Sequence, residues 1–201
     1  MIGRLQANQG NNRKQVNAMN VDDIKLLYEY NDWANHRILT ACANVSQEQY
    51  LAPFGDKSLR ATLVHTLDSA WGWRLGFKTY FVPLERLKEN PPARKWEGDE
   101  LTEADLPTLD ALNTRWQAEE QEMRAYLDSL SDQDLNGLIR YMIPGGIVRE
   151  RVLWHGLVHV VNHGTQHRSE AAMMLTSYGQ SPGGLDFTAF LNEHFNLEAE
   201  A

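Results

Sequence analysis

The sequence predicts an all-α protein built as a four-helix bundle with one long crossover. Apolar residues recur at three- and four-residue spacing in four long stretches, a pattern typical of helices that share a core. Proline and glycine are concentrated between these stretches, where they end the helices. With 201 residues, the chain has the length of a single domain with a sizeable core.

The N-terminal segment 1–18 is rich in Asn, Gln and Arg and shows no apolar periodicity. We expect this segment to be a flexible leader or a cloning remnant, and Met19 could be a second start. The predicted domain therefore comprises residues 19–201.

The first two helices have recognisable beginnings. Apolar positions follow helical spacing over 22–45, and two aspartates at the start suit the positive end of the helix dipole. Ser58 is a suitable N-cap for a second helix over 58–81. Three prolines interrupt the next segment, 82–104, which we interpret as a partly irregular crossover. Its length allows two neighbouring helices to run parallel.

The second half of the chain predicts two further long helices. The third covers 106–130, and a turn over 131–135 ends it. Weak alternation over 138–148, around a Pro-Gly-Gly sequence, predicts a short hairpin or an ordered loop. The last long helix covers 150–178 and ends at a glycine, and a short terminal helix over 187–194 follows. The residues of the third helix expected to face inward are Leu109, Leu112, Trp116, Met123 and Leu127.

Composition excludes several classes of partner. A net charge of -8 and a pI near 5.3 disfavour docking on phosphates, so no nucleic-acid partner is expected. No stretch approaches the ~20 apolar residues that span a bilayer, and the N-terminus lacks a signal-peptide core, so we expect a cytoplasmic protein without a membrane partner. The single cysteine, Cys42, cannot form an internal disulfide, and its apolar surroundings predict a buried, inert thiol.

The predicted last long helix carries four of the seven histidines: His155, His159, His163 and His167. Each follows the previous one by four residues, a step that advances about 6 Å and turns about 40° in a helix. Neighbouring members therefore share a face and can bind one ion. The same face includes apolar residues, so at least part of the series should point toward the core. A stack of buried imidazoles without a metal would be a costly way to fill a core. The spacing predicts a metal site but leaves the pairs 155/159, 159/163 and 163/167 open.

A third ligand must come from elsewhere, because catalytic metal sites commonly combine three protein ligands with an open position. His65 is the best candidate, since it lies in the middle of the second helix among small residues. The alternative is a core histidine bonded to a neighbouring carbonyl. His36 and His194 lie near predicted helix ends, where we expect them to face solvent.

Three motifs carry a resemblance to a known family. They are Tyr30-Asn-Asp-Trp-Ala-Asn35, Leu63-Val-His65, and the run from His159 to Arg168 that contains His-x3-His-x3-His-Arg. Together they resemble the DinB/YfiT-like metalloprotein family, and the resemblance covers nearly everything after residue 19. It implies a four-helix bundle with a metal bound by His65, His163 and His167, while His159 lies behind these ligands.

The chain departs from the commoner family pattern after Arg168, where it has Ser169 and Glu170. Glu170 returns to the face of the histidines, so it could orient a ligand, accept a proton or pair with a cation. His159 and Glu170 are therefore the candidates for a supporting catalytic role. The resemblance also implies a homodimer and, in some relatives, transfer of a low-molecular-weight thiol onto an electrophile.

These observations predict one divalent transition metal in a three-histidine site with open coordination positions. Imidazole suits zinc, nickel, copper and iron alike, and we take zinc, nickel or iron as the first choices. Such a site lowers the pKa of water or of a thiol, which favours a metal-dependent thiol S-transferase or hydrolase acting on a small-molecule substrate. The alternatives are a noncatalytic, stress-related protein that binds a metal or small ligand, and a structural bundle with packed histidines.

Overall fold

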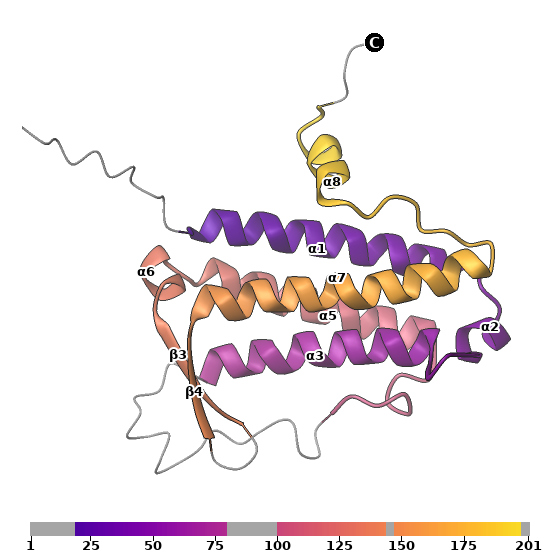
Figure 1. Ribbon diagram of the computed structural model, residues 1–201, viewed down its shortest axis with the longest axis horizontal. Helices are drawn as coiled ribbons and strands as arrows, with labels where there is room; N and C mark the ends of the chain where they lie inside the picture. The colour runs from indigo at the N-terminus through magenta and orange to yellow at the C-terminus, as the bar shows by residue number, and fades with distance from the viewer. Residues whose placement is uncertain (1–18, 80–99, 144–146, 198–201) are drawn as a thin grey trace, which may run out of the picture.

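The computed structural model describes residues 19–79, 100–143 and 147–197, and four long helices make up most of its core. They lie side by side, and α1 and α3 each contact both α5 and α7 (Figure 1). These contacts form a closed ring, and the predicted all-α class is confirmed. The four helices are α1 (Val21–Cys42), α3 (Leu59–Thr79), α5 (Leu109–Asp128) and α7 (Leu153–Ser177).

The helices run in two parallel pairs of opposite direction. In Figure 1, α1 and α7 run one way, whereas α3 and α5 run the other way. Side-chain bonds agree with this arrangement, because Arg74 of α3 bonds Glu119 of α5 and Lys78, one turn later, bonds Glu122. The predicted crossover between the second and third long helices is long enough for these neighbours, α3 and α5, to run parallel. Residues 80–99, most of that crossover, lie outside the described residues.

The predicted hairpin before the last long helix is confirmed and is longer than expected. Strands β3 (Leu138–Ile143) and β4 (Ile147–Val152) pair antiparallel over their whole length. The predicted start of the last helix at residue 150 is therefore wrong, because 150–152 pair with β3. The helix α7 begins at Leu153, whose N–H donates to the carbonyl of Gly137 at 2.9 Å.

The third helix begins at Leu109 rather than at 106, because the hydroxyl of Thr108 caps it by accepting from the N–H of Ala111. The predicted turn over 131–135 contains a short helix, α6 (Asp132–Leu135), since Ser131 and Asp134 form a capping box. Short side-chain caps of this kind decide element ends that apolar spacing does not show.

The segment between α1 and α3 contains elements that were not predicted. The first helix ends at Cys42 rather than near 45, and Ser46 then caps the short helix α2 (Gln47–Leu51). A small hairpin follows, formed by β1 (Pro53–Phe54) and β2 (Lys57–Ser58). The predicted cap of α3 is confirmed, because the hydroxyl of Ser58 accepts from the N–H of Ala61 at 3.0 Å.

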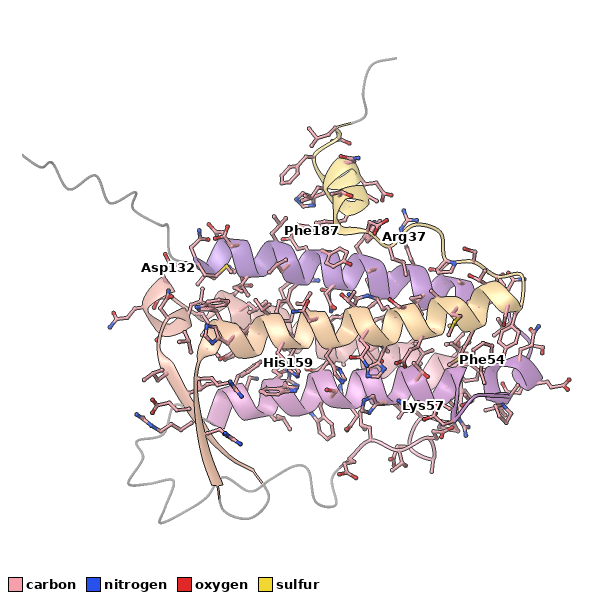
Figure 2. All side chains as sticks on the ribbon, in the orientation of Figure 1. Arg37, Phe54, Lys57, Asp132, His159 and Phe187 are labelled. Atoms are coloured by element: carbon pink, nitrogen blue, oxygen red, sulfur yellow. The ribbon has the colours of Figure 1, made fainter. Side chains whose placement is uncertain are left out.

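The predicted terminal helix is confirmed as α8 (Phe187–His194). It packs on α1, and Figure 2 shows Phe187 of α8 beside that helix. Phe187 and Tyr30 of α1 meet edge to face with ring centroids 5.2 Å apart. Among the described residues, no helix has both the length and the apolar character required to cross a bilayer.

The core consists of two apolar clusters separated by a polar band. One cluster contains Tyr28, Phe77 and Leu157, and the other contains Ile38, Leu67 and Leu175. Between them lie buried polar side chains from all four long helices, which we call the polar band: Asn35, Thr66, Arg74, Glu119, His167 and Arg168. Cys42 is buried in the second cluster, and burial raises its thiol pKa to about 12.

Candidate metal centre

His65 of α3 and His163 and His167 of α7 meet on one side of the polar band. One nitrogen from each ring lies within 4.8 Å of the others. The Nε2 atoms of His163 and His167 are 3.2 Å apart. Two imidazole nitrogens bound at about 2.1 Å to one tetrahedral zinc ion stand about 3.4 Å apart. The cluster therefore fits a single divalent ion with only small side-chain movements.

Helix geometry explains why these residues converge. His163 and His167 are one turn apart on α7, so their rings share a face with centroids 4.5 Å apart. The helix α3 runs antiparallel beside this face, and it places the His65 ring 4.7 Å from His167 and 5.3 Å from His163. The cluster thus joins segments about 100 residues apart in sequence.

The three rings differ in exposure. His167 is only 4% exposed, His163 is half-buried, and His65 is exposed. The cluster therefore opens to solvent on the side of His65, where a small molecule can reach it.

Burial, followed by the neighbouring histidines, lowers the pKa of His163 to about 4. Burial and then the charge of His167 also lower the pKa of His65. Both rings are therefore neutral at neutral pH. Since only neutral imidazole binds a metal, these two side chains are ready to act as ligands.

Glu170 accepts a hydrogen bond from the Nδ1 of His167, at 2.8 Å. This bond fixes the tautomer in which the lone pair of His167 lies on Nε2, the atom that faces His163. Of the three roles considered for Glu170, the structure supports orienting a ligand. The side chain is about one-third exposed, so it forms the edge of the cluster.

The other two histidines of the series do not join the cluster. His159 is exposed, and Figure 2 shows it on the side of α7 that faces α3. Its ring centroid lies 5.9 Å from His163 and 5.0 Å from Trp73 of α3. His155 is also exposed and packs against Trp154. The expectation that at least part of the series points toward the core is confirmed, since His167 is buried, while His155 and His159 are exposed. His36 and His194 are exposed, as predicted.

Arg168 has a structural role that the sequence did not reveal. Its buried guanidinium donates to Asn31 Oδ1 at 2.5 Å and to Asn35 Oδ1 at 2.9 Å. It thereby joins α7 to α1, while His163 and His167 of the same helix lie beside His65 of α3. Gly164 leaves the space, because a Cβ there would lie 2.8 Å from the guanidinium. Both asparagines of α1 therefore bond across the bundle to α7.

The helical fold and the three-histidine cluster define a mostly-α protein with a site of metal-binding geometry. A family model for the DinB family matches residues 15–199, and the chain belongs to that family. It is similar to Protein DinB of Bacillus subtilis (strain 168), with 29% identity over 172 residues. This match covers 82% of the present chain and 91% of the relative.

Proposed function

We propose that this protein is a metal-dependent transferase or hydrolase, with transfer of a small-molecule thiol onto an electrophile as the first choice. The observation that supports the proposal is the convergence of His65, His163 and His167 at a solvent-accessible edge of the polar band. A divalent transition metal such as zinc, nickel or iron, when bound there, would lower the pKa of a thiol or a water molecule.

The proposed metal ligands come from two helices. His163 and His167 would hold the ion from α7, and His65 would close the site from α3. Glu170 keeps His167 in the required tautomer by accepting its Nδ1–H. His159 lies one turn before His163, next to Trp73. An exposed imidazole there is placed to accept the proton of an incoming thiol.

The test has two steps. Protein purified without added metal is first analysed for bound elements, and we expect one transition-metal ion per chain. The double variant His163→Ala/His167→Ala should have none. Consumption of small thiols is then measured against a panel of electrophiles, with metal-loaded and metal-stripped protein compared.

Metal-dependent thiol consumption would support the enzyme. Bound metal without turnover of any thiol or hydrolysable substrate would favour a noncatalytic metal-binding protein instead. If neither the wild type nor the double variant contained metal, the three histidines would be packed side chains without a metal-binding role.

A further inference from the structure

Lys57 lies at the edge of the three-histidine cluster. It belongs to β2, directly before α3, and its side chain is half-buried. His65 follows about 9 Å along the helix axis from the start of α3. The lysine side chain has a flexible four-carbon stem that covers much of this distance. Its ammonium group can therefore lie beside the open side of the cluster, where His65 is exposed.

The antiparallel pairing of α3 and α7 places Lys57 and Glu170 at the same end of the cluster. Residues that precede His65 on α3 lie opposite residues that follow His167 on α7, and Glu170 comes one turn after His167. Figure 2 shows Lys57 near the start of α3 and His159 toward the other end of this helix pair. The cluster thus has a basic and an acidic side chain at one end and an imidazole at the other.

The electrostatic effects of Lys57 agree with this position. Burial, the charge of His167 and then the charge of Lys57 lower the pKa of His65. Burial raises the pKa of Glu170, but the hydrogen bond from His167 and the charges of His167 and Lys57 lower it overall. The ammonium group therefore acts on side chains from both helices of the cluster.

Lys57 forms no ion pair within residues 19–79, 100–143 and 147–197. The other two lysines in these ranges both pair with carboxylates of α5, Lys25 with Asp128 at 2.7 Å and Lys78 with Glu122 at 3.1 Å. The carboxylate of Glu170 instead accepts from the ring of His167. A half-buried ammonium group without a counterion is a suitable partner for an anion that enters the cluster from solvent.

We propose that Lys57 is a specificity-determining residue of the metal centre, which pairs with a carboxylate of the substrate while the substrate thiol binds the metal. This inference rests on the proposed function and names its substrate class, a small thiol that also carries a carboxylate. Three neutral imidazoles leave the full charge of a divalent ion in place, and this charge favours a thiolate. Lys57 then remains available for a second negative group, which neutral thiols lack.

The experiment measures thiol binding rather than turnover. Full-length protein is loaded with cobalt(II), because a bond between cobalt(II) and a thiolate gives a charge-transfer absorption band. The ligands are 3-mercaptopropionate and its methyl ester, which has the same thiol and no charge. The preference for the acid is the ratio of the two dissociation constants. Comparing this ratio between proteins cancels the difference in acidity between the two thiols.

We expect Lys57→Gln to reduce the preference for the acid about three- to tenfold, the range between an exposed ion pair and a charge-assisted hydrogen bond. Lys57→Arg keeps the positive charge and should retain most of the preference. Lys78→Gln is the matched control on the same side of the helix sequence, α3, and its ammonium group already pairs with Glu122. This control should leave the preference unchanged.

Arg151→Gln tests the opposite end of the cluster, where burial and then the charge of Arg151 lower the pKa of His159. It should also leave the preference unchanged. Cobalt content, measured in parallel, should be equal in all proteins, which shows that each variant folds with its metal site intact.

An equal preference in the wild type and Lys57→Gln would overturn the inference and leave thiol binding at the metal in place. An equal loss of affinity for acid and ester would also overturn it, because Lys57 would then act on the bound thiolate and not on a carboxylate. A loss of preference in Arg151→Gln alone would place the carboxylate at the other end. The absence of a charge-transfer band with both thiols would overturn thiol transfer itself, and this inference with it.

Discussion

The position of each histidine along α7 determines whether it can reach His65. His163 and His167 lie level with that residue, whereas His155 packs against Trp154 two turns earlier. We predict that His163→Ala or His167→Ala lowers metal affinity at least tenfold, because each removes a direct ligand. His155→Ala, an exposed member of the same series, should change it little, and so should His36→Ala. Competition with a coloured chelator measures the affinities, and equal values in all four variants would contradict the assignment.

Glu170 acts on the metal only through His167. Losing a carboxylate that orients a histidine ligand typically costs between about 10-fold and 100-fold in affinity. Because Glu170 is partly exposed, we predict a loss near the lower end, about tenfold, in Glu170→Gln. Ser169→Ala is the matched control, since the hydroxyl of that exposed side chain donates to the backbone of its own helix, at Thr165. The same chelator competition applies, and wild-type affinity in Glu170→Gln would show that the bond to His167 is incidental.

Asp32 predicts a pH-dependent contribution to stability. Its pKa is about 7 in the folded protein against an ordinary 3.8, so the folded state binds its proton more tightly than the unfolded state. This carboxyl therefore favours folding below about pH 4, and that contribution is lost as pH rises through about 7. Asp32→Asn should raise the free energy of unfolding at pH 8 by roughly 1–4 kcal/mol, given about 1.4 kcal/mol per pKa unit.

The gain in Asp32→Asn should disappear toward pH 4. Urea unfolding at several pH values measures it. Asp128→Asn is the control, because that exposed aspartate pairs with Lys25 at the surface of the same two helices. A gain in Asp32→Asn that does not change with pH would mean that the carboxyl has an ordinary pKa.

At the scale of elements, the approach of α1 to α7 depends on Gly164. A methyl group there would lie 2.8 Å from Arg168 Nη1 and 2.9 Å from Asn31 Oδ1. Alanine is the better helix former by about 1 kcal/mol, so propensity alone predicts a gain for Gly164→Ala. We predict instead a net loss of about 1–3 kcal/mol, because the buried Arg168 and Asn31 must move apart. Urea unfolding shows whether the free energy of unfolding rises or falls. Gly184→Ala is the control, because a Cβ at that position meets nothing within 4 Å.

Element positions could be predicted from apolar spacing, whereas several element ends could not. The start of α7 depends on pairing between β3 and β4, and the start of α5 depends on the hydroxyl of Thr108. The pair formed by His163 and His167 could not be chosen from spacing alone, because the choice depends on where α3 places His65. The link from Arg168 to α1 depends on how α7 is rotated about its axis, and this rotation cannot be predicted from a single sequence.

At the scale of the whole molecule, a metal held between α3 and α7 would link segments that the unfolded chain rarely brings together. An ion that binds only the native state stabilises it by mass action. We predict that excess nickel or zinc raises the Tm of the wild type at about pH 7.5, where His65 and His163 are neutral. In His65→Ala this gain should shrink sharply, because His163 and His167 lie within one helix and cannot join two.

Paired thermal melts with and without metal measure the effect. Metal-free stability should change less, since His65 is exposed and its loss leaves no cavity in the core. A full wild-type gain in His65→Ala would place the third ligand elsewhere, with His159 and Glu170 the next residues to test.

The location of Cys42 has a consequence for any chemistry that involves thiols and electrophiles. The chain contains one cysteine, it is 1% exposed, and its pKa of about 12 leaves almost no thiolate at neutral pH. Thiolate is the nucleophile that attacks alkylating agents and disulfides. The folded protein should therefore neither be alkylated by the electrophiles it is given nor form mixed disulfides with the thiols around it. Any thiol lost from a reaction mixture would then come from the added substrate and not from the protein.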